Sequence, residues 1–313
     1  MLTREEVKNR LFAIHDMDYV GICPSSVLEN EPAGHRPSDL LPNAKSIIVY
    51  GRKYIDGSIQ SKFRQIEDKV PLALGSYSAH SFVLSINHLC MKQTYEFAQY
   101  LEKNTGCFAM PLTNNVIQAV QPETETYLPF FVDRLASGMP LDIYKAAVAA
   151  GIGEMGWNHR VVTPDNGPRV YLCAILTDLE FDEYDQPYAG EKLCDPTTCK
   201  VCSEVCPVHC LDPEKGEEVE IAGNTYKTSD IDKFGCAAAC FGFKKYLNAR
   251  TRAVVEEDHP TEETLQKALA VHLQVPGIQT QDHIPMFHCD RCMIYCPVGN
   301  WKKTFKDRGL TKK

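Results

Sequence analysis

The amino-acid sequence predicts a mixed protein of helices and strands, α/β (α+β), followed by a small cysteine-rich domain. Helical and strand-like segments alternate over the first 190 residues, as expected for a mixed α and β domain. From Leu193 onward the composition changes to cysteine, proline and short polar loops. We therefore expect two domains, 1–190 and 191–313, with the boundary near Pro187–Leu193.

Composition and charge exclude several classes of protein. Of the 313 residues, 44% are hydrophobic and 24% are charged, an ordinary globular composition that excludes disorder, collagen and coiled coil. No apolar run reaches the roughly 18–20 residues that span a bilayer, so we expect no membrane partner. The charged N-terminus lacks the pattern of a signal peptide, which predicts a cytoplasmic protein. The net charge of −8 argues against nucleic acid as a partner.

Hydrophobic patterns predict the elements of the first domain. Apolar residues recur at helical spacing in some segments, and short apolar runs bounded by turn residues indicate strands. The expected helices are 3–14, 76–103 and 142–150. The expected strands are 19–23, 46–51, 107–112, 161–163 and 170–179. The proline-bearing stretch 113–139 is expected to be a loop around a site.

A glycine-rich segment follows the third expected helix. Gly151, Gly153 and Gly156 fit the G-x-G-x-x-G pattern of dinucleotide-binding sites. That pattern needs a strand before it and a helix after it, whereas here the preceding segment is helical and the following one is strand-like. We therefore expect a helix that ends in glycine and a tight loop, whose backbone can approach a flat ligand closely.

The fourteen cysteines are unevenly distributed. Disulfides are not expected in a reducing compartment. Four cysteines are scattered singly and are expected to be small buried side chains: Cys23, Cys90, Cys107 and Cys173. The other ten all lie between positions 194 and 296, which indicates a cofactor in the last third of the chain.

Two segments of that region share one spacing. Residues 199–207 and 289–297 both read C-x2-C-x3-C-P. In ferredoxins such a run holds iron through thiolates, and the cysteine before proline commonly ligates the other cluster. We therefore expect a ferredoxin-like domain with two [4Fe–4S] clusters. Paired C-x2-C units also suit structural zinc, which is the alternative.

Eight thiolates satisfy two such clusters. The expected ligands of cluster one are Cys194, Cys199, Cys202 and Cys296. Those of cluster two are Cys206, Cys289, Cys292 and either Cys236 or Cys240, which the sequence alone does not separate. Cys210 is not expected to be a ligand.

Four motifs in a fixed order resemble a known superfamily. They are AAVAAGIGEMGWN (146–158), VVTPDNGPRVYLCAILTDLEF (161–181), LCDPTTCKVCSEVCP (193–207) and FHCDRCMIYCPVGNW (287–301). Together they resemble the epoxyqueuosine reductases and reductive dehalogenases, over most of the chain. The chain departs from the epoxyqueuosine reductases at Ser137, where those enzymes carry an acidic catalytic residue. We also do not expect the C-terminal helical repeats that help many of them to bind transfer RNA.

The resemblance implies a nitroreductase-like first domain that holds a base-off cobalamin (corrinoid). It also implies that the two clusters pass electrons to cobalt. The backbone expected to face the corrinoid belongs to Gly151, Gly153, Gly156 and to Thr163, Pro164 and Gly167. Candidate proton donors are Tyr77, His80 and Tyr144, because a tyrosine beside a cation can protonate a developing anion.

These expectations combine into one hypothesis of function. The chain is expected to be a corrinoid-dependent iron–sulfur reductase that cleaves a carbon–heteroatom or carbon–halogen bond of a small organic substrate. Reduced ferredoxin or flavodoxin is the expected electron donor. The alternative is a non-catalytic iron–sulfur electron-transfer protein that reduces or reactivates a partner, such as a corrinoid protein.

Overall fold

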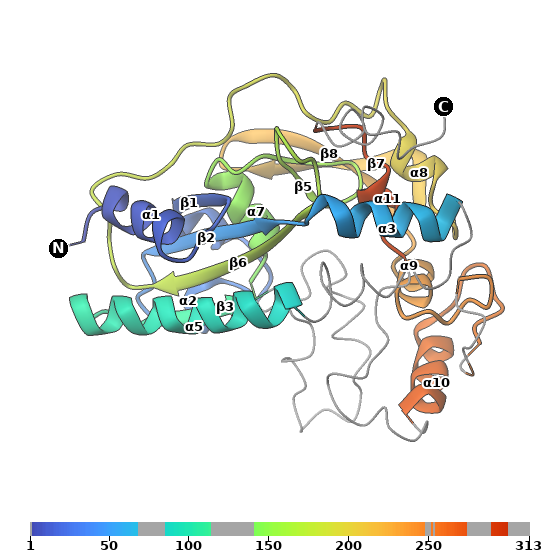
Figure 1. Cartoon of the computed structure of the whole chain (residues 1–313), viewed down its shortest axis with the longest axis horizontal. Helices are drawn as coiled ribbons and strands as arrows, with labels where there is room; N and C mark the ends of the chain where they lie inside the picture. The colour runs from blue at the N-terminus through green and yellow to red at the C-terminus, as the bar shows by residue number, and fades with distance from the viewer. Residues whose placement is uncertain are drawn as a thin grey trace.

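The structure is a computed structural model of the chain. It describes residues 2–67, 85–113, 141–247, 252, 254–273 and 289–299. A central sheet lies at one end of the described structure, and the cysteine-bearing helices lie at the other (Figure 1). Within the described residues, no helix is both long enough and apolar enough to cross a membrane.

The central sheet has four strands in the order β1-β2-β6-β3. Their bounds are Tyr19–Pro24 (β1), Ser46–Lys53 (β2), Val170–Thr177 (β6) and Ala109–Thr113 (β3). The four expected strands that form this sheet are thus confirmed to within a few residues. All three pairings are antiparallel. The fold is therefore α+β, and the α/β form of the expectation, which implies mostly parallel strands, does not describe this sheet.

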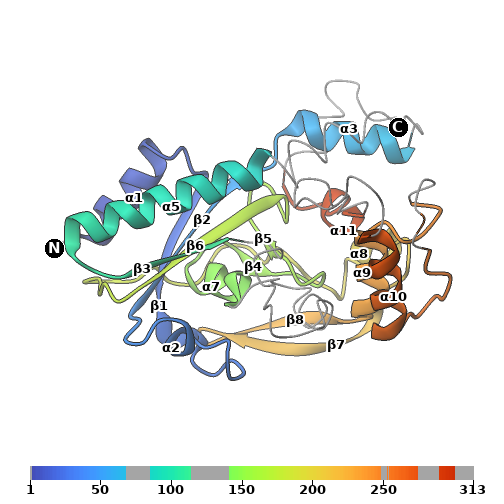
Figure 2. The ribbon, with the colours of Figure 1, turned by 90° about the horizontal axis from the view of Figure 1, so that it is seen from below.

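Alternate residues of the strands enter two separate cores, as the two-residue period of a strand requires. On one face, Ile48 and Ile175 pack beneath α1 (Arg4–Ala13) and α5 (Ser85–Thr105). On the other face, Ile47 packs against α7 (Ile143–Ala149) and its neighbours. Figure 2 shows the sheet between these two layers.

Capping residues fix where two of the helices begin. The Thr3 hydroxyl accepts from the Glu6 amide at 3.2 Å, and the Glu6 carboxylate accepts from the Thr3 amide at 2.8 Å. Helix α7 (Ile143–Ala149) begins after Asp142, whose carboxylate accepts from the Lys145 amide at 3.0 Å. The expected helices 3–14 and 142–150 are confirmed. Helix 76–103 is confirmed from residue 85 onward, and the rest of it lies outside the described residues.

Several elements of the first half were not expected from the sequence. Helix α3 (Asp56–Glu67) follows β2, and the proline-bearing segment between β1 and β2 contains η1 (Ser25–Leu28) and α2 (Pro37–Leu40). The glycine loop carries a two-residue strand, β4 (Glu154–Met155), which pairs with β5 (Val161–Val162). The strand expected at 161–163 is therefore confirmed. The loop expected at 113–139 lies outside the described residues except at Thr113.

The cysteine-rich part contains short helices and one long hairpin. The hairpin consists of β7 (Leu211–Ile221) and β8 (Asn224–Ile231), joined by Ala222 and Gly223, which both have positive φ as a two-residue hairpin turn requires. The helices are α8 (Val201–Glu204), α9 (Lys233–Cys240), α10 (Glu262–Leu273) and α11 (Arg291–Ile294). Helices α8 and α11, which carry the two cysteine runs, contact one another.

The cysteine-rich part packs against the same two cores as the sheet. Ile221 of β7 is buried in the core beside α7. Met293 and Ile294 of α11 are buried in the core beneath α1 and α5. This packing holds the cysteine runs in a fixed position relative to the sheet. The division into domains 1–190 and 191–313 stays a prediction, as do the nitroreductase-like and ferredoxin-like labels.

Candidate functional site

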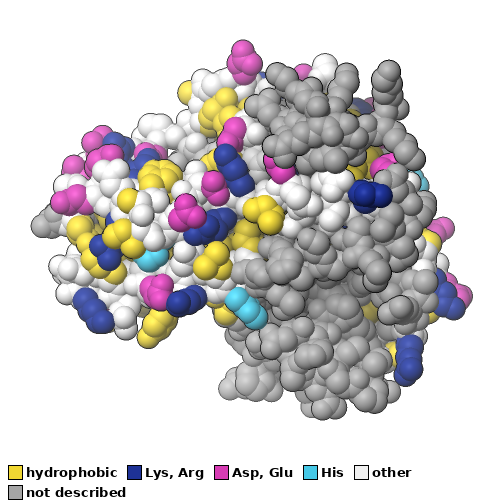
Figure 3. Space-filling model, in the orientation of Figure 1, with side chains coloured by type: hydrophobic (Ala, Val, Ile, Leu, Met, Phe, Trp, Pro, Cys, Tyr) yellow, Lys and Arg dark blue, Asp and Glu magenta, His cyan; other side chains and the backbone are white. Residues whose placement is uncertain are grey.

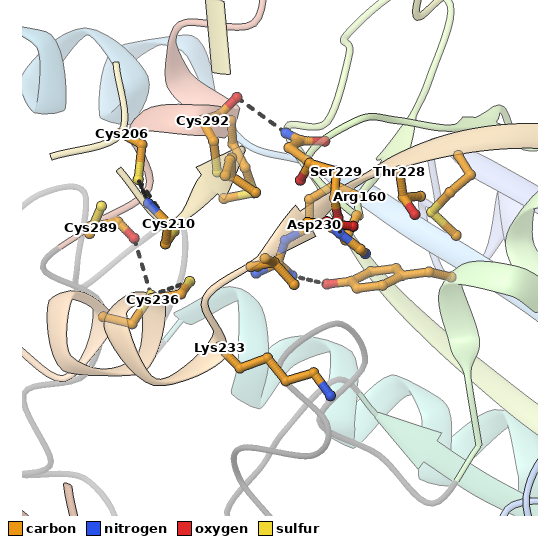
Figure 4. Close-up of a pocket in the computed structure, with 18 of the residues that line it drawn as sticks. Arg160, Cys206, Cys210, Thr228, Ser229, Asp230, Lys233, Cys236, Cys289 and Cys292 are labelled. Atoms are coloured by element: carbon orange, nitrogen blue, oxygen red, sulfur yellow. Dashed lines mark hydrogen bonds between the residues drawn. The ribbon is translucent and has the colours of Figure 1, made fainter. Parts of the chain in front are cut away.

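A cavity of about 740 Å³ lies where α7, the glycine loop, the hairpin and the cysteine runs meet. Its volume falls in the range of pockets that bind small molecules and cofactors, roughly 300–1,000 Å³. Residues that line it include Tyr144, Asn158, Arg160, Ser229, Cys236 and Cys292. In Figure 4 the labelled cysteines gather on one side of the view, and Arg160 lies toward the middle of it.

The four thiols expected to hold cluster one lie near one another. Burial, with the charges of Cys296 and Cys199, raises the pKa of the Cys194 thiol to about 11. Burial and the charge of Cys194, followed by those of Cys296 and Cys199, raise the pKa of Cys202 to about 12. Such mutual effects occur because these thiols lie close together in space, although they are up to 102 positions apart in the sequence.

A second group surrounds Cys206. Its sulfur is 3.3 Å from that of Cys210, and hydrogen bonding from Cys210 lowers the pKa of Cys206. Hydrogen bonds from Cys210 and Cys240 likewise lower the pKa of Cys236. Burial raises the pKa of Cys289 to about 12, and Cys236 and Cys206 contribute to that shift. The expected cluster-two thiols are thus neighbours, and the structure adds Cys210 to the group.

The chemistry of these donors fits iron–sulfur clusters. Metal ligation requires thiolates, a form that hydrogen bonds from neighbouring thiols favour at Cys206 and Cys236. Burial raises the pKa of Cys194, Cys202 and Cys289, so a bound metal would have to deprotonate these three. The two groups also adjoin one another, because Cys202, Cys206 and Cys292 belong to a single packed cluster. Among the described side chains, no three converge tightly enough to chelate one ion. A four-iron cluster takes one thiolate per iron, so its ligands surround a larger group than a single ion.

Two side chains fix the second cysteine run against the sheet. The guanidinium of Arg169, 1% exposed, donates to the carbonyls of Met293 at 2.9 Å and Cys296 at 3.0 Å. It also donates to the Val298 carbonyl. The Asn158 amide donates to the Cys292 carbonyl at 3.2 Å. These contacts give side-chain donors to carbonyls in and just after α11, where a helix runs out of backbone partners, and the Met293 carbonyl also accepts from the Cys296 amide at 3.4 Å.

Tyr144 and Arg160 form a polar pair in the wall of the cavity. Arg160 Nη1 donates to Tyr144 Oη, and the guanidinium carbon lies 5.3 Å from the centre of the tyrosine ring (Figure 4). Burial opposes the charge of Arg160, but Tyr144 and Cys292 raise the pKa of its guanidinium above the ordinary value. The tyrosine therefore has a permanent cation beside its hydroxyl. Tyr77 and His80, the other expected proton donors, lie outside the described residues.

Five of the six residues expected to face a corrinoid have close protein neighbours. A Cβ on Gly151 would stand 2.4 Å from the Gln186 carbonyl oxygen, and one on Gly153 would stand 2.2 Å from that of Val162. Gly156 and Gly167 are similarly close to the chain. The Thr163 amide and hydroxyl both donate to the Gly167 carbonyl at 2.9 Å, and Pro164 is exposed. Contact of these residues with a corrinoid stays a prediction.

Three further residues of the site were not expected to act in it: Glu154, Asn158 and Arg169. Glu154 Oε2 accepts from the amides of Leu193 at 2.8 Å and Cys194 at 3.3 Å. All three lie inside the glycine-loop and T-P-x-x-G-x-R motifs that carry the family resemblance. Their partners lie 35 or more residues away in sequence, and periodicity and spacing do not predict such contacts.

Comparison with known proteins identifies reductases as relatives. The tetrachloroethene reductive dehalogenase of Dehalobacter restrictus is 35% identical over 88 residues, which is 26% of this chain and 15% of that protein. The epoxyqueuosine reductase of Lactococcus garvieae is 25% identical over 200 residues, which is 60% of this chain and 48% of that protein. The matches thus span less than half of either relative. No family model matches the chain.

Solved structures that can be aligned with the chain include proteins of these two kinds. The structure of epoxyqueuosine reductase from Bacillus subtilis aligns with a TM-score of 0.48 at 16% identity, covering 94% of this chain and 65% of that one. The relatives are oxidoreductases, which supports an enzyme in general terms. The resemblance to the epoxyqueuosine reductase and reductive dehalogenase superfamily, expected from the motifs, is confirmed.

Proposed function

We propose that this chain is a corrinoid-dependent iron–sulfur reductase that cleaves a carbon–heteroatom or carbon–halogen bond of a small organic substrate. The observation that carries the proposal is a cavity lined by the second group of thiols and by a tyrosine–arginine pair, with the first group of thiols packed beside the second. The names of the relatives agree with it, since both are reductases. Cysteines 194, 199, 202 and 296 would hold one cluster, and 206, 289, 292 and 236 or 240 the other.

The net reaction replaces the bond between carbon and the leaving group by a C–H bond. It consumes two electrons and one proton, and it releases the leaving group as an anion. The clusters and a corrinoid, when bound, supply the electron transfer and a strongly reducing metal centre. The chain itself then has to deliver the proton, position the substrate and exclude water from the cavity.

Tyr144 is the residue that we propose as the proton donor. Its hydroxyl lies in the cavity wall, and the side chain is 5% exposed, which limits proton exchange with bulk water. Arg160 donates to that hydroxyl and stabilises the phenolate that forms when the proton leaves. Reduced ferredoxin or flavodoxin would supply the electrons, and we propose no nucleic-acid partner.

A metal count tests the proposal directly. The protein is purified without oxygen from cells supplied with cobalamin, and iron, cobalt and zinc are measured per chain. We expect about eight irons, the content of two four-iron clusters, together with one cobalt. Iron at that level without cobalt would favour the electron-transfer alternative, and zinc without iron would overturn the proposal.

A substitution separates the proton donor from the metal sites. Tyr144→Phe should keep the wild-type metal content and lower kcat by about 10²–10⁴-fold, the range typical of general acids. Activity is measured on a panel of organohalides and epoxides with a chemical reductant. Tyr226→Phe is the control, because Tyr226 packs against the core of α7 and does not line the cavity. Unchanged kcat in Tyr144→Phe would exclude Tyr144 as the donor.

A further inference from the structure

The glycine loop after α7 lies against the chain that leads into the cysteine-rich part. Gly151 has a φ of +77°, and its α-carbon faces the Gln186 carbonyl. Any side chain there would also collide with that carbonyl, at 2.4 Å. Gly153 of the same loop approaches β5 equally closely, since a Cβ there would stand 2.2 Å from the Val162 carbonyl oxygen. The glycines therefore let the loop fit between β5 and the segment that precedes Cys194.

Two groups of this loop hold Cys194. The Glu154 carboxylate accepts from the Leu193 amide at 2.8 Å and from the Cys194 amide at 3.3 Å. The backbone amide of Trp157 donates to Cys194 Sγ at 3.3 Å. The Trp157 indole extends the contact to the first cysteine run, because it donates to Ser203 Oγ at 3.3 Å.

Cys194 needs such support because its spacing is irregular. Four residues separate it from Cys199, whereas the ferredoxin run has two residues at that point. The extra residues form a closed turn in which the Cys199 amide donates to the Asp195 carbonyl at 3.0 Å. The Asp195 carboxylate accepts from the Thr197 amide at 2.9 Å, which stabilises the turn. The turn fixes one side of Cys194, and Glu154 fixes the other.

We propose that Glu154 is a positioning residue for the first iron–sulfur cluster and that the glycine loop is the element that presents Cys194 to it. This inference rests on the proposed function, since it takes Cys194 to be a ligand. The carboxylate orients the backbone of the ligand, and the Trp157 amide donates to its sulfur. Hydrogen bonds to cluster sulfurs are among the factors that set a reduction potential, so the loop also sets the potential of this cluster.

The experiment compares Glu154→Gln and Glu154→Ala with wild type and with Glu191→Gln. Glu191 is an exposed acid three residues before Cys194, which makes it the matched control. Iron content, the rate of iron loss to a chelator and the midpoint potentials of both clusters are measured without oxygen. We expect Glu154→Ala to lose iron about 10–100-fold faster from one cluster, the range for residues that support metal ligands. The potential of that cluster should shift, while the other cluster and Glu191→Gln match wild type.

A second comparison shows whether Glu154 acts through Cys194. In Cys194→Ser, the added Glu154→Gln substitution should have no further effect on the potential or the iron-loss rate, because the ligand sulfur whose position Glu154 fixes is already gone. Additive effects in the double variant would overturn the inference. Wild-type potentials and wild-type rates of iron loss in both Glu154→Gln and Glu154→Ala would also overturn the inference. A wild-type chain that binds no iron would instead overturn the proposed function itself, so the two failures are distinguishable.

Discussion

Replacement of Arg169 by methionine should destabilise the protein and loosen the second cysteine run. The guanidinium of Arg169 is 1% exposed and donates to the carbonyls of Met293, Cys296 and Val298. Methionine fills a similar volume but offers no donor. The carbonyls of Cys296 and Val298, just beyond α11, would therefore lose this donor, whereas the Met293 carbonyl would keep the Cys296 amide at 3.4 Å.

The size of the effect follows from the two carbonyls that lose their donor. A buried acceptor left without a partner costs about 1–3 kcal/mol. Two of them give about 2–6 kcal/mol, and water that reaches these part-buried carbonyls of Cys296 and Val298 brings the expected loss to about 2–4 kcal/mol. That is a large part of the roughly 5–15 kcal/mol by which domains are stable. Arg169→Lys, which keeps a cation and fewer donors, should lose less.

Urea unfolding of the iron-loaded protein, followed by circular dichroism without oxygen, measures this loss. Iron per chain is measured on the same samples. Lys92→Met is the control, since Lys92 is an exposed residue paired only with Glu96 and should change stability by no more than about 0.5 kcal/mol. If Arg169→Met loses less than about 1 kcal/mol and keeps its iron, Arg169 does not hold the second cysteine run.

Three further predictions test the packing, the ligand set and the pH dependence. Gly153→Ala places a Cβ 2.2 Å from the Val162 carbonyl and should lower the free energy of unfolding by about 1–3 kcal/mol in a urea titration, whereas Gly57→Ala, which meets nothing within 4 Å, should not destabilise. Cys210→Ser should keep about eight irons per chain, because eight other thiols suffice for two clusters, and a loss of about four would make Cys210 a ligand. Burial lowers the pKa of His15 in the folded chain. As the pH falls below about 6.5, the unfolded chain therefore binds a proton at His15 more readily than the folded chain, and the free energy of unfolding decreases. That acid loss should be smaller in His15→Leu when urea midpoints at pH 7 and pH 5 are compared, and an equal loss in both proteins would contradict the role of His15.

The surface also limits what sequence patterns can reveal. Acidic and basic side chains are interspersed over the described part of the face in Figure 3. The hairpin β7–β8 is an example of an element with little buried surface: most residues of β7 are exposed, and only Leu211 and Ile221 are buried. A strand without an alternating apolar face gives no periodic signal, so the hairpin was not expected. Helix α3 was not expected either, although Ile59 and Ile66 form part of its buried face.

The sequence by itself determined the strands of the central sheet and indicated the chemistry of a cofactor. The strands of the central sheet are short apolar runs, and their composition alone marks them. The repeated C-x2-C-x3-C-P spacing indicates iron–sulfur ligation because neighbouring thiolates are local in the chain. The strand order and the antiparallel pairing could not be obtained in this way, because both depend on the path that the connections between strands take through space.

The tertiary structure decided how the site is assembled. It brought Cys296 to Cys194, Arg169 to the end of α11, Glu154 to the amide of Cys194 and Arg160 to Tyr144. In the first three, partners 40 to 127 residues apart meet because each core buries side chains of the sheet together with side chains of the cysteine-rich part. Periodicity describes neighbours along one element, whereas the packing of the whole chain determines which elements meet.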